Sequence, residues 1–165
     1  MTEWPHDDQI SLMRFYGRPG QVAMANVVVP WRMIYNEPPH QHIPHFLMHV
    51  KCVAATERAL QAIWDHYQHS QEAIEAIGMH LWGGAYNPRK IRGSNRWSVH
   101  AFGAAVDFDP DNNEMNYSPH NPHKMAQPVI DCFKAEGAFW GGDFSYRHDP
   151  MHFQFAHEGF VRRKR

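Results

Sequence analysis

The chain has few cysteines, no long apolar run and no excess of charge of either sign. Its two cysteines, Cys52 and Cys132, do not form a Cys-x-x-Cys pair, which argues against a zinc ribbon and against a disulfide framework. No window approaches the ~18 apolar residues that span a bilayer, so no stable membrane insertion is expected. The formal net charge of −1, from 16 basic and 17 acidic side chains, argues against a general nucleic-acid-binding protein.

The two ends of the chain carry little targeting information. Residues 1–8 contain no basic segment followed by an apolar stretch, so no secretory signal peptide is predicted. The protein is therefore expected to be synthesised in the cytoplasm and to reach any target outside it by another route. The basic run 162–165 is expected to be a solvated tail, with contact to an anionic polymer as the alternative.

The length of 165 residues fits one domain over 1–165, with enough chain to bury a core. Residues 1–45 are rich in glycine and proline turn signals, which predicts an irregular lead-in with one or two short strands. Between 49 and 77 the apolar residues recur with helical spacing, and a break near 69–70 divides this segment into two predicted helices.

The second half of the chain has a different pattern. Residues 97–109 are predicted to be extended around Gly103, and 139–155 alternate aromatic and polar residues as strands with a turn do. A short helix is expected over 129–136. Helices concentrated early and strands concentrated late predict an α+β fold.

Two segments contain side chains that suit a hydrolytic metal site. The first holds His100 and Asp107, and the second holds Asp149 and His152. Two neutral imidazoles and one carboxylate can bind zinc, and the fourth coordination position of the metal then stays open for water. A second carboxylate that does not bind the metal can transfer protons. The chain has 14 histidines, so their number alone says little, and the helical zinc motif H-E-x-x-H is absent.

The spacing within each segment permits convergence without requiring it. His100 and Asp107 are seven residues apart, about 10.5 Å along an α-helix, so an extended chain bent at Gly103 suits a shared ion better. Asp149 and His152 are three apart and would lie on opposite faces of an ideal strand, unless a kink at the intervening proline reorients them. Taken singly, each residue could equally be an ordinary core or turn residue.

Together the segments resemble the zinc peptidoglycan peptidases, which include VanX-like D-Ala-D-Ala dipeptidases and carboxypeptidases and phage L-alanyl-D-glutamate endopeptidases. The pattern S-x-H-x-x-G-x-A-x-D of that family is met by five residues: Ser98, His100, Gly103, Ala105 and Asp107. The later pattern, an acidic residue, two other residues and then histidine and an aromatic residue, is met by Asp149, His152 and Phe153.

Two further segments extend the resemblance. Residues 83–94 look like the loop that carries the family's substrate-facing arginine, and 140–143 look like the segment before the last ligand in the endopeptidase branch. The specific motifs therefore occupy a catalytic core over 83–155. Gln154 departs from the family, which commonly has glutamate there, and this puts the tuning of His152 in doubt.

The resemblance implies the site and the fold. It implies that His100, Asp107 and His152 bind one Zn²⁺ per chain and that Asp149 is the general base. It also implies a small antiparallel sheet that carries the zinc site, flanked by helices, as in Hedgehog-like and DD-peptidase-like folds. The donor set alone does not fix the metal, because the same residues can accept other divalent ions.

The resemblance also implies a positive group for the oxyanion of the reaction. Arg89 is the expected residue, and Arg92 is the alternative. Ser98 could serve in the site or be structural.

The expected function is hydrolysis of the peptidoglycan stem peptide, in the form of an L-alanyl-D-glutamate endopeptidase of a phage or prophage. The alternatives are a D-alanyl-D-alanine carboxypeptidase or dipeptidase on the same scaffold and, more distantly, a zinc-retaining binding module without activity. We expect a monomer that acts on the bacterial cell wall after release, with a holin-type partner that permeabilises the membrane.

Overall fold

The computed structural model describes residues 2–159, so the basic run 162–165 lies outside the described residues. The helices and strands follow in the order α1 (Gln9–Tyr16), β1 (Met24–Val28), β2 (Ile34–Tyr35), β3 (His45–His49), α2 (Val50–His66), α3 (Gln71–Ala76), β4 (Leu81–Gly84), β5 (Ala105–Phe108), α4 (Gln127–Ala135), β6 (Phe139–Trp140) and β7 (His152–Gln154). Three short 3-10 helices lie between them: η1 (Val99–Phe102), η2 (Pro110–Asn112) and η3 (Gly141–Asp143).

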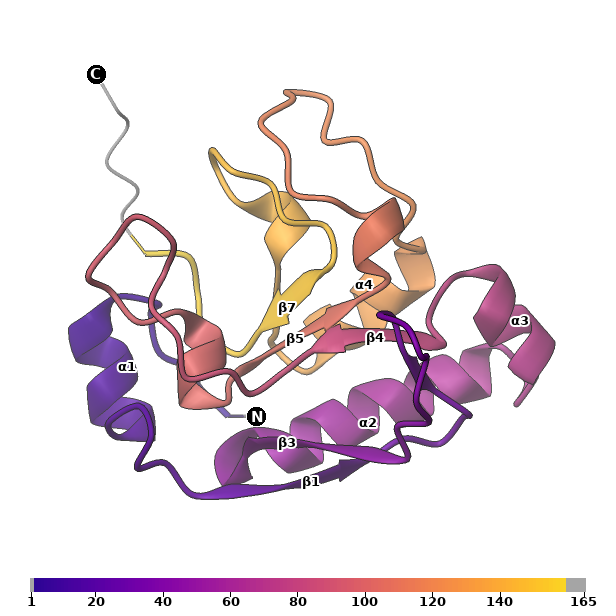
Figure 1. Cartoon of the computed structure of the whole chain (residues 1–165), viewed down its shortest axis with the longest axis horizontal. Helices are drawn as coiled ribbons and strands as arrows, with labels where there is room; N and C mark the ends of the chain where they lie inside the picture. Colours follow the sequence, from indigo (N-terminus) through magenta and orange to yellow (C-terminus); the bar gives the residue numbers. More distant parts are fainter. Residues whose placement is uncertain (1, 160–165) are drawn as a thin grey trace.

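A five-stranded sheet with the order β2-β4-β5-β7-β6 forms the centre of the fold. All its pairs are antiparallel except β2 with β4, which are parallel. The α+β class is therefore confirmed, and the expected antiparallel sheet is mixed at this one edge. In the view of Figure 1, α2 and the separate β1–β3 pair lie below the sheet, and the loops after β5 and before β7 lie above it.

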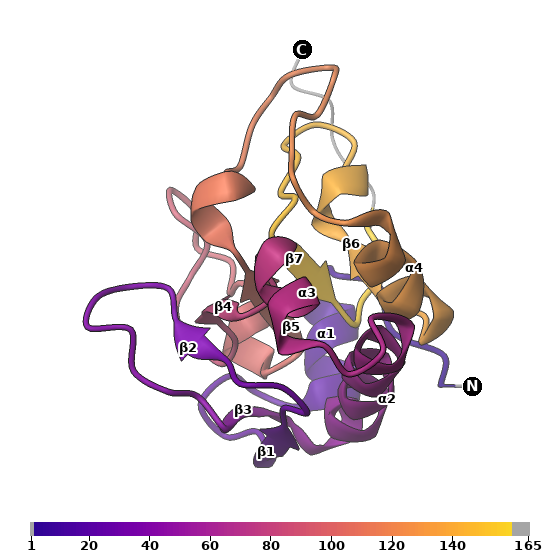
Figure 2. The same cartoon turned by 90° about the vertical axis from the view of Figure 1, so that its right-hand side faces the viewer.

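The helices cover the sheet with the apolar faces that their periodicity predicted. The buried side of α2 includes Leu60 and Ile63, and α2 packs against α4, as the side view in Figure 2 shows. Phe133 of α4 stacks on Phe153 of β7 with ring centroids 4.3 Å apart, which fixes the helix over the strand that carries the later motif. The predicted break between α2 and α3 is confirmed, with the Ser70 side chain capping α3.

The first part of the chain is more regular than expected. Helix α1 was not predicted, although Asp8 is a good N-cap residue whose carboxylate accepts the N–H of Ser11 at 2.9 Å. Strands β1 and β2 account for the one or two short strands expected in this region. None of the helices among the described residues is long and apolar enough to cross a membrane.

The prediction of extended chain over 97–109 was right for β5 and wrong at His100, and the bend expected at Gly103 is present. His100 lies in η1, which ends at Gly103 in the left-handed conformation with φ of 70°. A Cβ at this position would lie 2.7 Å from the backbone nitrogen of His49, so glycine is required both for its conformation and for the close approach. The turn bends the chain so that His100 faces Asp107 of β5.

Candidate active site

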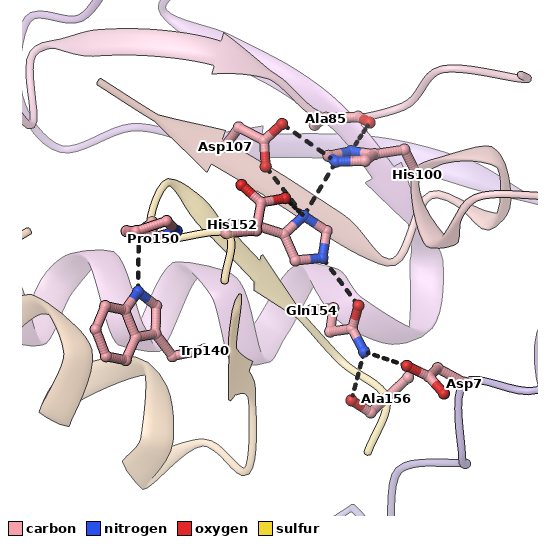
Figure 3. Close-up of polar contacts among 10 residues, drawn as sticks. Asp7, Ala85, His100, Asp107, Trp140, Pro150, His152, Gln154 and Ala156 are labelled. Carbon is pink, nitrogen blue, oxygen red and sulfur yellow. Dashed lines mark hydrogen bonds and ion pairs between the residues drawn. The ribbon is translucent and has the colours of Figure 1, made fainter. Parts of the chain in front are cut away.

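Three side chains from two separate segments of the sequence converge at the centre of the sheet. Asp107 and His152 are paired residues on the neighbouring strands β5 and β7, and His100 reaches them from η1 (Figure 3). The Nδ1 atom of His152 lies 3.0 Å from Oδ1 of Asp107 and 3.2 Å from Nε2 of His100. The remaining pair, Nε2 of His100 and Oδ2 of Asp107, is also 3.2 Å apart. Both histidines are buried.

Hydrogen bonds on the far side of each imidazole determine which nitrogen faces the cluster. Nδ1 of His100 lies 2.7 Å from the carbonyl oxygen of Ala85, which can only accept, so Nδ1 donates and the Nε2 lone pair is free. Nε2 of His152 donates to Oε1 of Gln154 at 2.8 Å, which leaves its Nδ1 lone pair free. Both free nitrogens point toward Asp107.

The spacing of these donor atoms fits a divalent metal. A tetrahedral zinc ion with bonds of about 2.0–2.1 Å places its ligand atoms about 3.3 Å apart, close to the three separations in the cluster. Two nitrogen lone pairs and a carboxylate oxygen that face one another are mutually repulsive unless a cation or a proton lies among them. This group of His100, Asp107 and His152 is the one potential metal cluster found within residues 2–159.

A proton takes the place of the cation in the metal-free chain. Burial lowers the pKa of His152, but the hydrogen bond and charge of Asp107 outweigh it and raise this pKa to about 9. Burial opposes ionisation of Asp107 as well, yet the two histidines hold its pKa below the usual range. The cluster therefore binds positive charge strongly.

We predict that the stability of the metal-free chain falls as pH rises from 6.5 to 9. The pKa of His152 lies above its unfolded value of 6.5, so its contribution is complete below pH 6.5 and is lost as pH rises through about 9. Thermal melts in a chelator should show this fall, and the increase in melting temperature caused by zinc should grow over the same range, because protons compete with metal. A zinc-induced rise in melting temperature that becomes smaller as pH increases would contradict this expectation.

Asp149 lies beside the cluster in a tight turn. The N–H of His152 donates to the Asp149 carbonyl at 3.0 Å across the turn, and Pro150 occupies the second position, which its fixed φ favours. Oδ2 of Asp149 is 4.0 Å from Nδ1 of His152, and its Oδ1 is buried with no hydrogen-bond partner. Burial raises the pKa of this carboxyl. The predicted kink at Pro150 thus brings the spare carboxylate to the same centre.

Residues 140–142 hold the turn at Asp149 and Pro150 in place. The indole N–H of Trp140 donates to the carbonyl of Pro150 at 2.8 Å, and the N–H of Asp149 donates to the carbonyl of Gly141 at 2.8 Å. A Cβ on Gly141 would collide with the Asp149 carbonyl, and a Cβ on Gly142 would collide with the Trp140 ring. The glycines therefore permit the close packing that fixes Asp149.

The cluster opens into a cleft of about 730 Å³. The three cluster residues and Asp149 line it, together with Ser98 and four exposed arginines, Arg89, Arg92, Arg96 and Arg147. The loop that carries Arg89 is fastened to the site, because the N–H of Ser98 donates to the Arg89 carbonyl at 3.2 Å. Both arginines suggested by the sequence thus face the same cleft as the cluster.

Residues 92–155 match the family model described as D-alanyl-D-alanine carboxypeptidase. This match supports the resemblance of the motif-bearing part of the chain to the zinc peptidoglycan peptidases. The matched segment contains the three cluster residues and Asp149, and the protein is therefore a zinc-dependent hydrolase of the peptidoglycan-peptidase type. Searches of curated proteins and of solved structures gave no match.

Several residues of the peptidase cleft were not singled out from the sequence, among them three charged ones, Arg96, Arg147 and Asp7. Arg96 and Arg147 belong to no recognisable motif, and Asp7 precedes the motifs by more than 70 residues. Only the cluster of basic residues around the 83–94 loop could have suggested Arg96. Asp7 enters the site through pairing of the N-terminal segment with residue His157, which no local pattern indicates.

Proposed function

We propose that the peptidase is an L-alanyl-D-glutamate endopeptidase of peptidoglycan, of the type used by phage endolysins. The observation that carries the proposal is the arginine-lined cleft around the His100, Asp107 and His152 cluster. Four arginines on its walls suit a substrate with several carboxylates along its length, such as a stem peptide that contains glutamate. A carboxypeptidase that binds one terminal carboxylate needs fewer such groups.

The three cluster residues are the proposed ligands of one zinc ion per chain. When bound there, zinc polarises the scissile carbonyl and lowers the pKa of water toward about 7. The partly buried Asp149 carboxylate is placed to accept a proton from the attacking water and to deliver it to the leaving amine. Its free Oδ1 faces no competing donor within the described residues.

Digestion of purified sacculi tests which bond is cut. New L-alanine carboxyl ends and D-glutamate amino ends, identified by mass spectrometry, support the endopeptidase. Release of free D-alanine or of the D-Ala-D-Ala dipeptide would instead assign the carboxypeptidase or dipeptidase reaction. Release of no peptide at all from several wall types would contradict peptidoglycan hydrolysis by this cleft.

We also propose that Arg89 stabilises the oxyanion of the reaction. Its loop is anchored to Ser98, whereas Arg92 lies farther along the same exposed loop. We predict that Arg89→Ala lowers kcat about 10²- to 10³-fold, the usual loss for an oxyanion donor, while Arg92→Ala mainly raises KM. Steady-state kinetics on a soluble stem peptide measure both, with the exposed Arg32→Ala outside the cleft as the control. The reverse ranking would transfer the role to Arg92.

A further inference from the structure

The surroundings of Gln154 explain how an amide can occupy the position where related peptidases commonly have glutamate. The Nε2 group of Gln154 donates to the carbonyl oxygen of Ala156 at 3.0 Å and to Oδ2 of Asp7 at 3.2 Å (Figure 3). Both amide protons are therefore taken by oxygen acceptors. The amide oxygen is left to face His152, where it accepts from Nε2.

Asp7 is held in place by the two ends of the described chain. Its N–H donates to the carbonyl of His157 at 2.9 Å, and the N–H of His157 donates to the carbonyl of Pro5 at 2.8 Å. The second carboxylate oxygen of Asp7, Oδ1, accepts from the N–H of Gly159 at 2.7 Å. Both oxygens of Asp7 thus act as acceptors, one for Gly159 and one for Gln154.

We propose that Asp7 is a positioning residue for His152, acting through Gln154. The Asp7 charge polarises the amide, which strengthens its oxygen as an acceptor and retains the proton on Nε2 of His152. The Nδ1 lone pair of His152 is then directed at the metal cluster. A carboxylate is thereby supplied one residue farther from the imidazole than position 154, where related peptidases commonly have glutamate. This inference rests on the ligand set of the proposed function.

The isosteric variant Asp7→Asn tests the arrangement. An asparagine has one acceptor oxygen, so its NH₂ group must face either the Gly159 N–H or the Gln154 NH₂, and one donor is set against another. We predict zinc binding about 10- to 100-fold weaker, measured by competition with a chromophoric chelator. The imidazole Nε2–H signal of His152 in zinc-loaded protein, seen in long-range ¹H–¹⁵N spectra, should also exchange faster with solvent.

The neighbouring Asp8 provides a matched control. Asp8→Asn removes the same charge one residue away, and asparagine caps a helix about as well as aspartate does, so α1 is retained. Zinc affinity and the His152 signal should both stay at their wild-type values. An equal loss in the two variants would show that charge or folding of the N-terminal segment is responsible, and would overturn the proposal.

A double-mutant cycle separates positioning from simple loss of packing. Gln154→Glu in the otherwise unchanged chain sets two carboxylates against each other, so zinc binding should weaken. In the Asp7→Asn background the same change should be less harmful, because the amide introduced at position 7 can donate to the carboxylate at position 154. The carbonyl of Ala156 opposes that carboxylate in both backgrounds, so its effect cancels in the cycle.

The outcomes distinguish this inference from the proposed function. Unchanged zinc affinity in Asp7→Asn, or strictly additive effects in the cycle, would overturn the role of Asp7 while leaving the ligand set intact. A wild-type chain that binds no zinc would overturn the ligand set, and the inference with it. Weaker binding in Asp7→Asn, no change in Asp8→Asn and a favourable coupling in the cycle would support it.

Discussion

Replacing Asp149 with alanine should abolish hydrolysis and leave the zinc content unchanged. The carboxylate lies 4.0 Å from Nδ1 of His152, and its Oδ1 has no protein partner among the described residues, so its removal takes away a proton acceptor rather than a metal donor. Loss of a positioned general base lowers the rate about 10²- to 10⁴-fold. Turnover of a soluble stem peptide and zinc analysis of the same sample measure the two effects.

Asp149→Asn refines this experiment because it keeps the shape of the side chain. Burial raises the pKa of Asp149 and so favours its neutral form, and we therefore expect the neutral amide not to lower the melting temperature. Asp143→Asn is the matched control in the same segment: Asp143 is exposed and pairs with Lys134 at the surface, so activity should be retained. Full activity in Asp149→Asn would remove the residue from the mechanism, and loss of zinc would make it part of the metal site.

The sequence carried more information about the chemistry of the site than about its geometry. The residues that converge in the cleft stand in motifs, so His100, Asp107, His152 and Asp149 could be selected from the order of the amino acids alone. The bend at Gly103 was also predictable, since glycine permits a left-handed turn. That this turn ends a 3-10 helix was not, because its position depends on close packing against the backbone of His49.

Contacts between distant segments account for what could not be predicted. The parallel pairing of β2 with β4 depends on the path of the whole lead-in, which has only short apolar pieces. The Asp7 contact requires the N-terminal segment to pair beside His157, and neither partner has a distinctive neighbourhood in sequence. The departure at Gln154 was visible as a mismatch, but its compensation by Asp7 appears only when the chain is folded.

Replacing His100 with alanine should remove both zinc binding and activity. The change deletes Nε2, one member of a cluster whose donor atoms lie 3.0–3.2 Å apart. Only Asp107 and His152 then remain to bind the metal, beside the space left by the imidazole. Loss of His100, a proposed direct ligand, should weaken zinc binding by more than the about 10- to 100-fold typical of residues that only orient a ligand, which is the role proposed for Asp7. Calorimetric titration with zinc and melting curves with and without the metal measure the loss.

A matched histidine variant makes the His100 result specific. His120 is exposed on the loop after β5 and lies outside the cluster, so His120→Ala should retain one equivalent of zinc and the full zinc-induced rise in melting temperature. The zinc-induced rise should vanish in His100→Ala, because a metal stabilises a fold only to the extent that it binds the native state. If His100→Ala still bound one equivalent with wild-type affinity, the metal would have to lie elsewhere, and the convergence of η1, β5 and β7 would need another explanation.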